Sequence, residues 1–306
     1  MLDYEIVLAN EWLTASIDPL GAVVTRLVHK PTGLHWLFEA PSRAAREQSP
    51  FIYGLVPLFP PGRIRGGRFA LGGWEYQWPV NDPSGHANLH GVGFNRVWEV
   101  DGRHAEGVRL RLDQDRCPEF GAPFSLVLEY RLSDRALVME AELVNTGAAA
   151  PIPAALGYHI NVDLTACDYR CQWPPRIPWE VDGHLIPTGR RGPMRGRDTV
   201  AAREVVEDQP YRLVAGRFEP VALTAVDQGV RVVLDASSEF GQLVIYRPSR
   251  DARFLSVEPY TWVPNAPNLT LPPAETGLVA LAPGAAQRWR ATVTFIDDAQ
   301  GEREEG

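Results

Sequence analysis

Glycine and proline interrupt this chain at short intervals: each occurs 27 times among 306 residues, and both are scattered throughout. Many of the short runs between them alternate apolar with polar residues or are rich in β-branched residues, which is typical of strands. The clearest half-buried strand patterns are residues 124–132 and 289–295. Only residues 42–47 resemble a helix, and no repeat of fixed period is found. The pattern therefore predicts an all-β protein, a large sandwich or barrel.

The length of the chain allows one large domain or two small ones. No Gly/Ser-rich linker divides the sequence. The most irregular segment, residues 165–212, is interpreted as an insertion that carries part of a pocket. We therefore expect a single domain over residues 1–296, followed by an acidic, flexible tail over residues 297–306.

Composition and charge narrow the class of protein. Hydrophobic residues make up 45% of the chain and charged residues 22%, as in soluble globular proteins. Lys and Arg number 30 against 38 Asp and Glu, and the resulting net charge of −8 argues against a partner that is nucleic acid or an anionic membrane. Lys30 is the only lysine and lies in a turn-like stretch, which argues against Schiff-base or PLP chemistry.

Three features predict a cytoplasmic protein. Residues 1–5 show neither the basic nor the apolar region of a signal peptide. No apolar run approaches the ~18 residues of a membrane-spanning helix. The cysteines are too few, and odd in number, to form a disulfide framework; they are Cys117, Cys167 and Cys171.

Two of the seven histidines lie in unusual contexts. His90 is followed by Gly91 and Gly93, which allow a tight turn beside the imidazole and suit a site residue at a loop or strand end. The alternative for His90 is an ordinary surface loop. His159 lies in an otherwise apolar strand pattern, residues 156–161, so it either faces a pocket or is a hydrogen-bonded core group.

Two charged residues are further candidates. Glu258 ends an apolar run among aromatic residues, where the pKa of a carboxyl can be raised enough for a general base near neutral pH. A solvated strand end is the alternative. Arg63 lies in a turn-rich segment with Arg65 and Arg68, and arginine suits sugar hydroxyls, carboxylates or phosphates. For Arg65 and Arg68, an exposed basic hairpin is the favoured interpretation.

Metal and cofactor motifs are weak or absent in the sequence. Cys167 and Cys171 lack the second pair that a structural zinc site needs. His90, His159 and Glu258 could in principle form a two-His, one-carboxylate metal triad, but the His-x-His strand of cupins is missing. No Walker A, dinucleotide glycine motif or Gly-x-Ser-x-Gly elbow is present. We therefore expect neither a metal nor a cofactor.

Five segments, taken in chain order, resemble the aldose 1-epimerase (galactose mutarotase) family, and the resemblance runs from about residue 5 to residue 296. They are Gly-Arg-Ile-Arg-Gly-Gly-Arg-Phe at 62–69, Leu-His-Gly with Gly-Phe-Asn-Arg-Val-Trp at 89–98, Gly-Tyr-His at 157–159, Glu-Pro-Tyr-Thr with Asn-Ala-Pro-Asn at 258–268, and Gly-Leu-Val-Ala-Leu-Ala-Pro-Gly at 277–284. Each motif alone is weak, but five in order are strong evidence for membership.

The resemblance implies a large, twisted antiparallel β-supersandwich with a sugar site on its concave face, and a mutarotase reaction without a cofactor. It implies roles for individual residues as well. Glu258 would be the general base and His159 the general acid, while His90 would bind near the ring oxygen. Arg63 would hold sugar hydroxyls, with Tyr260 as a further substrate-binding residue. Asp208 is the candidate for a substrate-binding aspartate, and Asp227 is its rival.

Three departures from the family pattern concern the identity of the sugar. Gly62 replaces Asn, Ile160-Asn161 replaces Pro-Tyr-Phe after the histidine, and Tyr260 replaces Trp. We expect a small aldose such as glucose or galactose as the partner, and a monomer or homodimer. Two alternatives remain open: an epimerase of a phosphorylated hexose, for which Arg65, Arg68 and Arg96 supply cations, and a non-catalytic carbohydrate-binding protein on the same fold.

Overall fold

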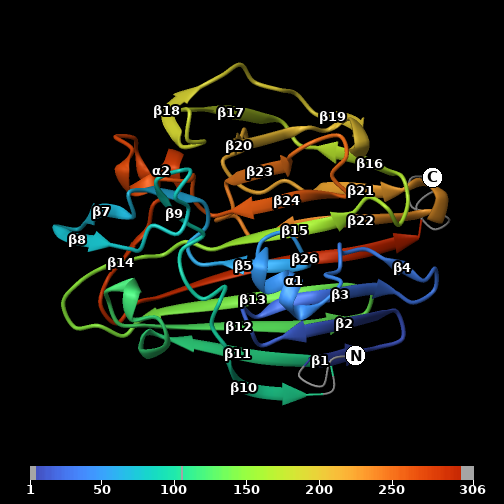
Figure 1. Cartoon of the computed structure of the whole chain (residues 1–306), viewed down its shortest axis with the longest axis horizontal. Coiled ribbons are helices and arrows are strands. Elements are labelled where there is room, and N and C mark those ends of the chain that lie inside the picture. The colour runs from blue at the N-terminus through green and yellow to red at the C-terminus, as the bar shows by residue number, and fades with distance from the viewer. Residues whose placement is uncertain (1–4, 105, 298–306) are drawn as a thin grey trace.

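Two large antiparallel β-sheets pack face to face in the computed structural model, which describes residues 5–104 and 106–297 (Figure 1). This confirms the predicted all-β sandwich. The first sheet has eleven strands. In order across the sheet they are β1 (Ile6–Ala9), β2 (Leu13–Asp18), β3 (Val23–His29), β5 (Leu55–Leu58), β15 (Gly157–Asp163), β24 (Phe254–Tyr260), β23 (Gln242–Arg247), β20 (Glu207–Leu213), β17 (Arg176–Val181) and β18 (Pro187–Arg191), with β4 (Leu34–His35) paired to β3.

The second sheet has nine strands and forms the other layer of the sandwich. In order they are β10 (Glu99–His104), β11 (Gly107–Asp113), β12 (Phe124–Ser133), β13 (Ala136–Asn145), β26 (Ala286–Asp297), β22 (Val230–Ala236), β21 (Val221–Ala225), β16 (Tyr169–Trp173) and β19 (Asp198–Ala201). Three two-stranded sheets complete the structure: β6 (Arg63–Arg65) with β9 (Ala87–Leu89), β7 (Arg68–Leu71) with β8 (Trp74–Gln77), and β14 (Ile152–Pro153) with β25 (Ala280–Leu281).

Alternation along the strands places the core between the two sheets. Every second side chain of β12 is buried and the intervening ones are not, as the apolar–polar alternation of residues 124–132 predicts. The two layers also meet through a polar contact, since the buried Tyr130 hydroxyl donates to the Ala22 carbonyl oxygen at 2.7 Å. Most buried apolar side chains of both sheets form one cluster, so burial between the layers stabilises the sandwich.

The central strands β15 and β24 differ from this pattern because nearly all their residues are buried. Tyr158, Ile160 and Val257 point into the core cluster. Their neighbours in sequence point to the opposite face, away from the nine-stranded sheet. Burial on both faces means that this part of the eleven-stranded sheet is covered from outside as well, by the loops that carry the small sheets and α1.

Residues 165–212 correct the sequence-based expectation. The segment is not an insertion outside the fold, because its five strands, β16 to β20, belong to the two large sheets. Three of them lie at one end of the eleven-stranded sheet and two at one end of the nine-stranded sheet. Pro174 and Pro175 fall between β16 and β17, where proline removes no ladder hydrogen bond. The expectation that this segment carries part of a pocket is met, because Leu185 and Asp208 line one.

The described residues contain two short α-helices. α1 (Arg43–Gln48) matches the predicted helix, and its N-cap Ser42 accepts a hydrogen bond from the amide of Ala45. α2 (Pro273–Thr276) was not expected. Within the described residues, neither these helices nor any other has the length and hydropathy needed to cross a membrane.

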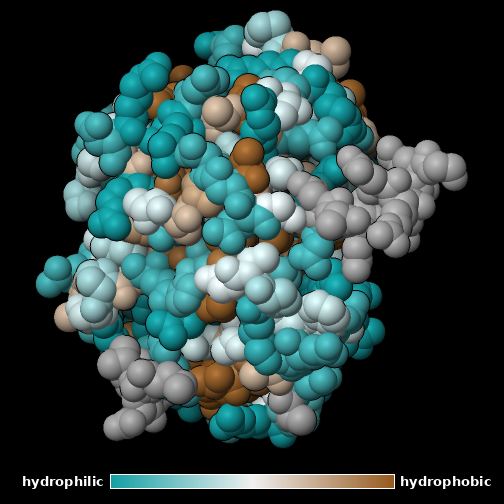
Figure 2. Space-filling view, turned by 90° about the vertical axis from the view of Figure 1, so that its right-hand side faces the viewer, coloured by the Kyte–Doolittle hydropathy of each residue, from teal (hydrophilic) through white to brown (hydrophobic). Residues whose placement is uncertain are grey.

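The surface and the C-terminal end complete the description. One face of the molecule is covered mainly by hydrophilic residues, with hydrophobic side chains visible in limited areas (Figure 2). Asp297 ends strand β26 and pairs with Arg135 at 2.6 Å. The remainder of the predicted acidic tail, residues 298–306, lies outside the described residues.

Candidate functional site

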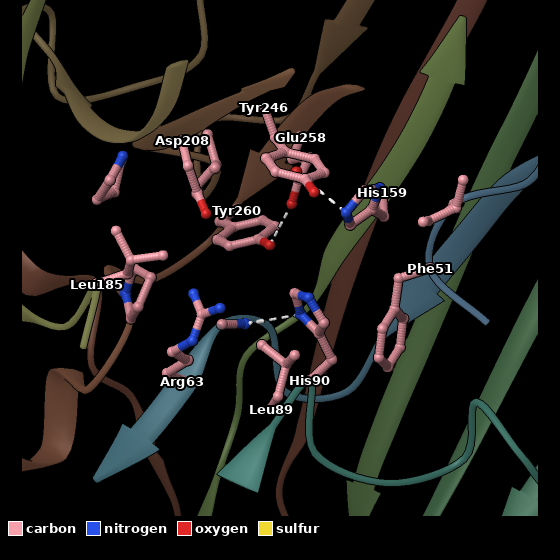
Figure 3. A pocket seen from close by; sticks show the side chains of 15 residues that line it. Phe51, Arg63, Leu89, His90, His159, Leu185, Asp208, Tyr246, Glu258 and Tyr260 are labelled. Carbon is pink, nitrogen blue, oxygen red and sulfur yellow. Dashed lines mark hydrogen bonds and ion pairs between the residues drawn. The ribbon is translucent and has the colours of Figure 1, made fainter. Parts of the chain in front are cut away.

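A pocket of about 240 Å³ lies over the outer face of the central strands of the eleven-stranded sheet (Figure 3). Strands β15, β20, β23 and β24 form its floor, and the segments around β6, β9 and residues 51–52 form its walls. The residues that line it are Phe51, Ile52, Gly62, Arg63, Leu89, His90, His159, Leu185, Asp208, Pro210, Val244, Tyr246, Glu258, Tyr260 and Pro264.

Sheet register brings together residues that lie far apart in the sequence. Gly157 pairs with Tyr260 and Ile160 with Val257, so His159 of β15 lies opposite Glu258 of β24. On the next strand, Val244 pairs with Glu258, and Asp208 of β20 pairs with Tyr246 of β23. Because side chains alternate along each strand, these positions share the outer face of the sheet.

His159 and Glu258 are in direct contact at the floor of the pocket. The distance between His159 Nε2 and Glu258 Oε1 is 3.2 Å (Figure 3). Their residues are 4% and 2% exposed, so both groups are removed from bulk water. The structure therefore shows that His159 faces the pocket and is not a core group. It also shows that Glu258 is buried and not at a solvated strand end.

Burial shifts the pKa values of this pair toward a neutral state. It raises the pKa of Glu258 well above its ordinary range; the hydrogen bond from the Tyr260 hydroxyl opposes the shift, the charge of Asp208 adds to it and that of Arg63 opposes it. Burial lowers the pKa of His159 to about 3, against a smaller upward effect of the hydrogen bond with Asn161. Both shifts favour a protonated carboxyl group and a neutral imidazole when no ligand is bound.

His90 lies beside this pair, directly after β9. Its Nδ1 accepts a hydrogen bond from the amide of Gly62 at 3.1 Å, so the neutral ring carries its proton on Nε2. Burial, followed by the charges of His159 and Arg63, holds the pKa of His90 well below its ordinary value. Only glycine fits at position 91, because a Cβ there would lie 2.1 Å from the Phe59 carbonyl oxygen. His90 is thus placed as a neutral hydrogen-bond donor.

Arg63 reaches the pocket from β6, and an aspartate that sequence reasoning missed holds it there. Asp82 Oδ2 lies 2.9 Å from Arg63 Nε. The other oxygen of Asp82 accepts hydrogen bonds from the Ser84 hydroxyl at 2.6 Å and the Gly85 amide at 3.0 Å. The Asp-Pro-Ser-Gly turn at 82–85 is the sequence signal that could have identified this carboxylate.

The two aspartates that the sequence left as rivals are now separated. Asp208 lines the pocket, and burial raises its pKa while the charge of Arg63 lowers it. Asp227 lies in a 3-10 turn, Val226–Gln228, is exposed, and is not among the lining residues. Only Asp208 is therefore placed to contact a ligand in this pocket.

The other arginines that were considered as phosphate ligands lie outside the lining and have partners of their own. Arg65 pairs with Asp182, Arg96 pairs with Glu119 at 2.8 Å, and Arg68 donates to Gln77 at 3.0 Å. Among the residues that the structure describes, Arg63 is the one guanidinium in the lining.

The aromatic residues near the motifs separate into three groups. Tyr260 lines the pocket, whereas Trp36, Trp78, Tyr158 and Trp262 are buried in the core cluster, and Trp74 is exposed on the β7–β8 hairpin. Two aromatic rings of the lining, those of Phe51 and Tyr246, were not expected from the sequence. Their signal is weak, because only the sheet topology brings them to the site.

Within residues 5–104 and 106–297, no three His, Cys, Asp or Glu side chains are placed to hold a metal ion together. The three cysteines are buried and form no disulfide. The described lining thus brings a histidine and a carboxyl group together beside hydrogen-bonding groups that suit a polar ligand.

The chain is similar in sequence to a known family over nearly its whole length. A family model described as aldose 1-epimerase matches residues 4–295. An uncharacterized Escherichia coli K12 protein, YihR, is 32% identical over 148 residues, which are 46% of this chain and 47% of that protein. The match thus spans about half the length of this curated relative.

Solved structures agree over nearly the whole chain. A galactose mutarotase-like protein from Clostridium acetobutylicum superposes with a TM-score of 0.87 at 25% identity, covering 96% of this chain and 95% of that one. A GalM/aldose epimerase homologue from Caenorhabditis elegans gives 0.77 at 19% identity, covering 96% and 98%. With the family match over residues 4–295, these findings show that the chain belongs to the aldose 1-epimerase family.

Proposed function

We propose that the protein is a mutarotase that interconverts the α and β anomers of a free aldose such as glucose or galactose. The observation that carries this proposal is the contact between His159 Nε2 and Glu258 Oε1, 3.2 Å apart at the floor of the pocket. In a cyclic aldose, the anomeric hydroxyl oxygen and the ring oxygen are bonded to the same carbon, C1. An acid and a base side by side can therefore reach both oxygens at once.

The reaction needs one proton to leave and one to arrive. Glu258, as the carboxylate, takes the proton of the anomeric hydroxyl while His159, as the imidazolium, donates its Nε2 proton to the ring oxygen. The C1–O5 bond breaks and the electron pair of the former O–H bond forms the aldehyde. Rotation about C1–C2 presents the other face of the carbonyl, and the roles reverse when the ring closes.

The starting state places the shared proton on His159, against the preference that burial imposes. Two contacts stabilise the carboxylate: the Tyr260 hydroxyl donates a hydrogen bond to Glu258, and the guanidinium of Arg63 lies nearby. A sugar whose anomeric hydroxyl donates to Glu258 adds a third stabilising contact. Binding of the sugar thus favours the charged pair that the reaction requires.

The remaining lining residues fit the binding of a neutral, polyhydroxylated ligand. Arg63 offers donors, Asp208 offers an acceptor, and His90 offers its Nε2 proton near the ring oxygen. Tyr260 supplies a polar edge, and the ring of Phe51 supplies an apolar face for sugar C–H groups.

The charges of the pocket favour an unphosphorylated sugar. Arg63 is the one guanidinium in the described lining and is already paired with Asp82 at 2.9 Å, so no unpaired guanidinium there is left for a phosphate. The non-catalytic alternative is less well supported, since a protein that only binds sugar has no use for a histidine and a carboxyl in contact on the pocket floor.

Polarimetry of freshly dissolved sugars tests the proposal. α-Glucose, α-galactose and α-glucose 6-phosphate would be followed at low buffer concentration, which suppresses spontaneous mutarotation. Faster decay of a free sugar supports the proposal, whereas acceleration confined to the phosphorylated sugar contradicts the substrate class. Binding of these sugars by calorimetry, with no acceleration of any of them, would instead identify a carbohydrate-binding protein.

A further inference from the structure

We propose that Asn161 is a positioning residue that holds a proton on Nδ1 of His159 and so reserves Nε2 for the transfer to and from the substrate. The inference rests on the proposed function, because it assigns Asn161 a part in that reaction. Asn161 lies two residues after His159 on β15, on the same face of the sheet, and is fully buried. It is not among the residues that line the pocket, so it acts through His159.

The orientation of the Asn161 amide is determined by its partners. Its Nδ2 donates to two backbone carbonyl oxygens, those of Phe51 at 3.0 Å and Gly54 at 3.1 Å. Carbonyl oxygens only accept, so the NH₂ group must point toward them. On the other side, Oδ1 accepts from the hydroxyl of Ser256 at 2.6 Å. Ser256 is its paired residue on the neighbouring strand β24.

This orientation decides the tautomer of His159. Asn161 Oδ1 can only accept a hydrogen bond, and His159 Nδ1 lies 3.1 Å from it. Nδ1 must therefore carry a proton in the neutral ring as well as in the imidazolium. Nε2, which faces Glu258 at 3.2 Å, is then the nitrogen that gains and loses a proton. The other tautomer would place a lone pair against a lone pair at Oδ1.

The same contact also favours the reactive charge state. The Asn161 carbonyl stabilises the imidazolium, which raises the pKa of His159 against the larger effect of burial. The side chains that face the His159 ring from the adjoining elements are Glu258 on β24, Tyr246 on β23, His90 after β9 and Phe51 after α1. Of these, only Glu258 becomes negatively charged in the proposed reaction, when its proton moves to His159, so Asn161 supplies the second stabilising contact from the opposite edge of the ring.

NMR of the protein labelled with ¹⁵N-histidine tests the tautomer independently of any activity. The His159 signals would be assigned by their absence from the His159→Gln variant. In the wild-type protein, Nδ1 is expected to show a proton-bearing shift and Nε2 an unprotonated or exchange-averaged one. A His159 ring with its proton on Nε2 and a bare Nδ1 would overturn the proposal.

Kinetics of Asn161→Ala provide the second test. Since Asn161 does not touch the sugar, kcat is expected to fall about 10- to 100-fold, a part of what a general acid contributes, with KM changed less than twofold. Asn145→Ala is the matched control: this buried asparagine also donates to two backbone carbonyl oxygens, those of Ala150 and Leu281, at 2.9 Å each. It should lose stability but keep its kcat.

A third variant covers the case in which Asn161→Ala does not fold. Ser256→Ala removes one donor to Asn161 Oδ1 but leaves the Asn161 amide held by its two carbonyl partners. His159 should therefore keep its tautomer, and the variant should keep most of the wild-type kcat. Unchanged kcat in a folded Asn161→Ala protein contradicts the proposal. If the wild-type protein accelerates no sugar, the proposed function fails, while the NMR result still decides the tautomer.

Discussion

His159 and Glu258 lie opposite one another on the central strands β15 and β24, with Nε2 and Oε1 3.2 Å apart. Antiparallel pairing makes this distance a property of the sheet rather than of a mobile loop. Both strands are covered on both faces, which holds the two groups in place and keeps water from them. Groups that stabilise the carboxylate or the imidazolium therefore decide which of the two carries the proton.

Removal of the Tyr260 hydroxyl should make the Glu258 carboxylate less stable. The hydroxyl donates to Glu258 and lowers its pKa, so Tyr260→Phe should raise that pKa further. Activity near neutral pH should fall about tenfold, for the loss of a charge-assisted hydrogen bond. Because Glu258 has the higher pKa of the pair, the reactive state with one proton on His159 is lost as pH rises through the pKa of Glu258. The basic limb of the pH profile of kcat/KM should therefore move to higher pH. An unchanged basic limb would show that Glu258 does not depend on this contact.

Substitution of Asp82 should weaken sugar binding through Arg63. Asp82→Asn keeps an acceptor for Ser84 and Gly85 but removes the negative charge beside the guanidinium. KM is expected to rise about tenfold, within the range for a hydrogen bond to a charged group, with a smaller change in kcat. Gln77→Ala, which removes the partner of Arg68 outside the pocket, is the control and should leave KM unchanged. Equal effects of both substitutions would contradict the role of Arg63.

The choice between two aspartates can be tested by one matched pair of variants. Asp208→Asn removes a buried carboxyl from the pocket lining and should lower kcat/KM by about tenfold or more. Asp227→Asn changes an exposed turn residue and should have no effect on either constant. A loss of activity confined to Asp227→Asn would show that the substrate lies elsewhere.

The stability of Glu258→Gln should depend on pH in a defined direction. Since the folded-state pKa of Glu258 is raised, its protonated form stabilises the folded protein below the ordinary glutamate pKa of about 4.3, and that contribution is lost as pH rises through the raised pKa. Glutamine does not titrate and can donate to His159 Nε2. The Tm of the variant relative to wild type should therefore increase as pH rises above about 4.3. A constant or falling difference in thermal unfolding would contradict the raised pKa.

Much of the architecture could be predicted from local patterns. Alternation in residues 124–132 indicates a half-buried strand because one face of β12 packs on the core. The sequence of residues 165–212 indicates an insertion rather than strands, because its strands are short and contain prolines and so lack this alternation. Pro178, for example, lies within β17, where it pairs with Tyr211. Only the neighbouring strands show that such a segment belongs to both sheets.

The residues of the candidate site also divide into those with a local sequence signal and those without one. His90, His159, Glu258 and Arg63 lie in recognisable motifs, and the structure brings them to one pocket. Asp82 has only its turn motif, and Phe51, Tyr246 and Asn161 carry no comparable signal, because their positions follow from contacts across the sheet or from folded loops. The bond between Asn161 and Ser256, for example, joins residues 95 positions apart. Local sequence contains no information about such pairings.

The most direct test of the account is polarimetry of fresh α-galactose and α-glucose with equal amounts of wild-type, Glu258→Gln and Asp227→Asn protein, each shown to be folded by thermal unfolding. We expect the wild type and Asp227→Asn to accelerate mutarotation equally. Glu258→Gln should show no more than about a hundredth of the wild-type acceleration, since loss of a general base lowers the rate by about 10²–10⁴. A folded Glu258→Gln protein with turnover close to wild type would contradict the assignment of the His159–Glu258 pair as the catalytic acid and base.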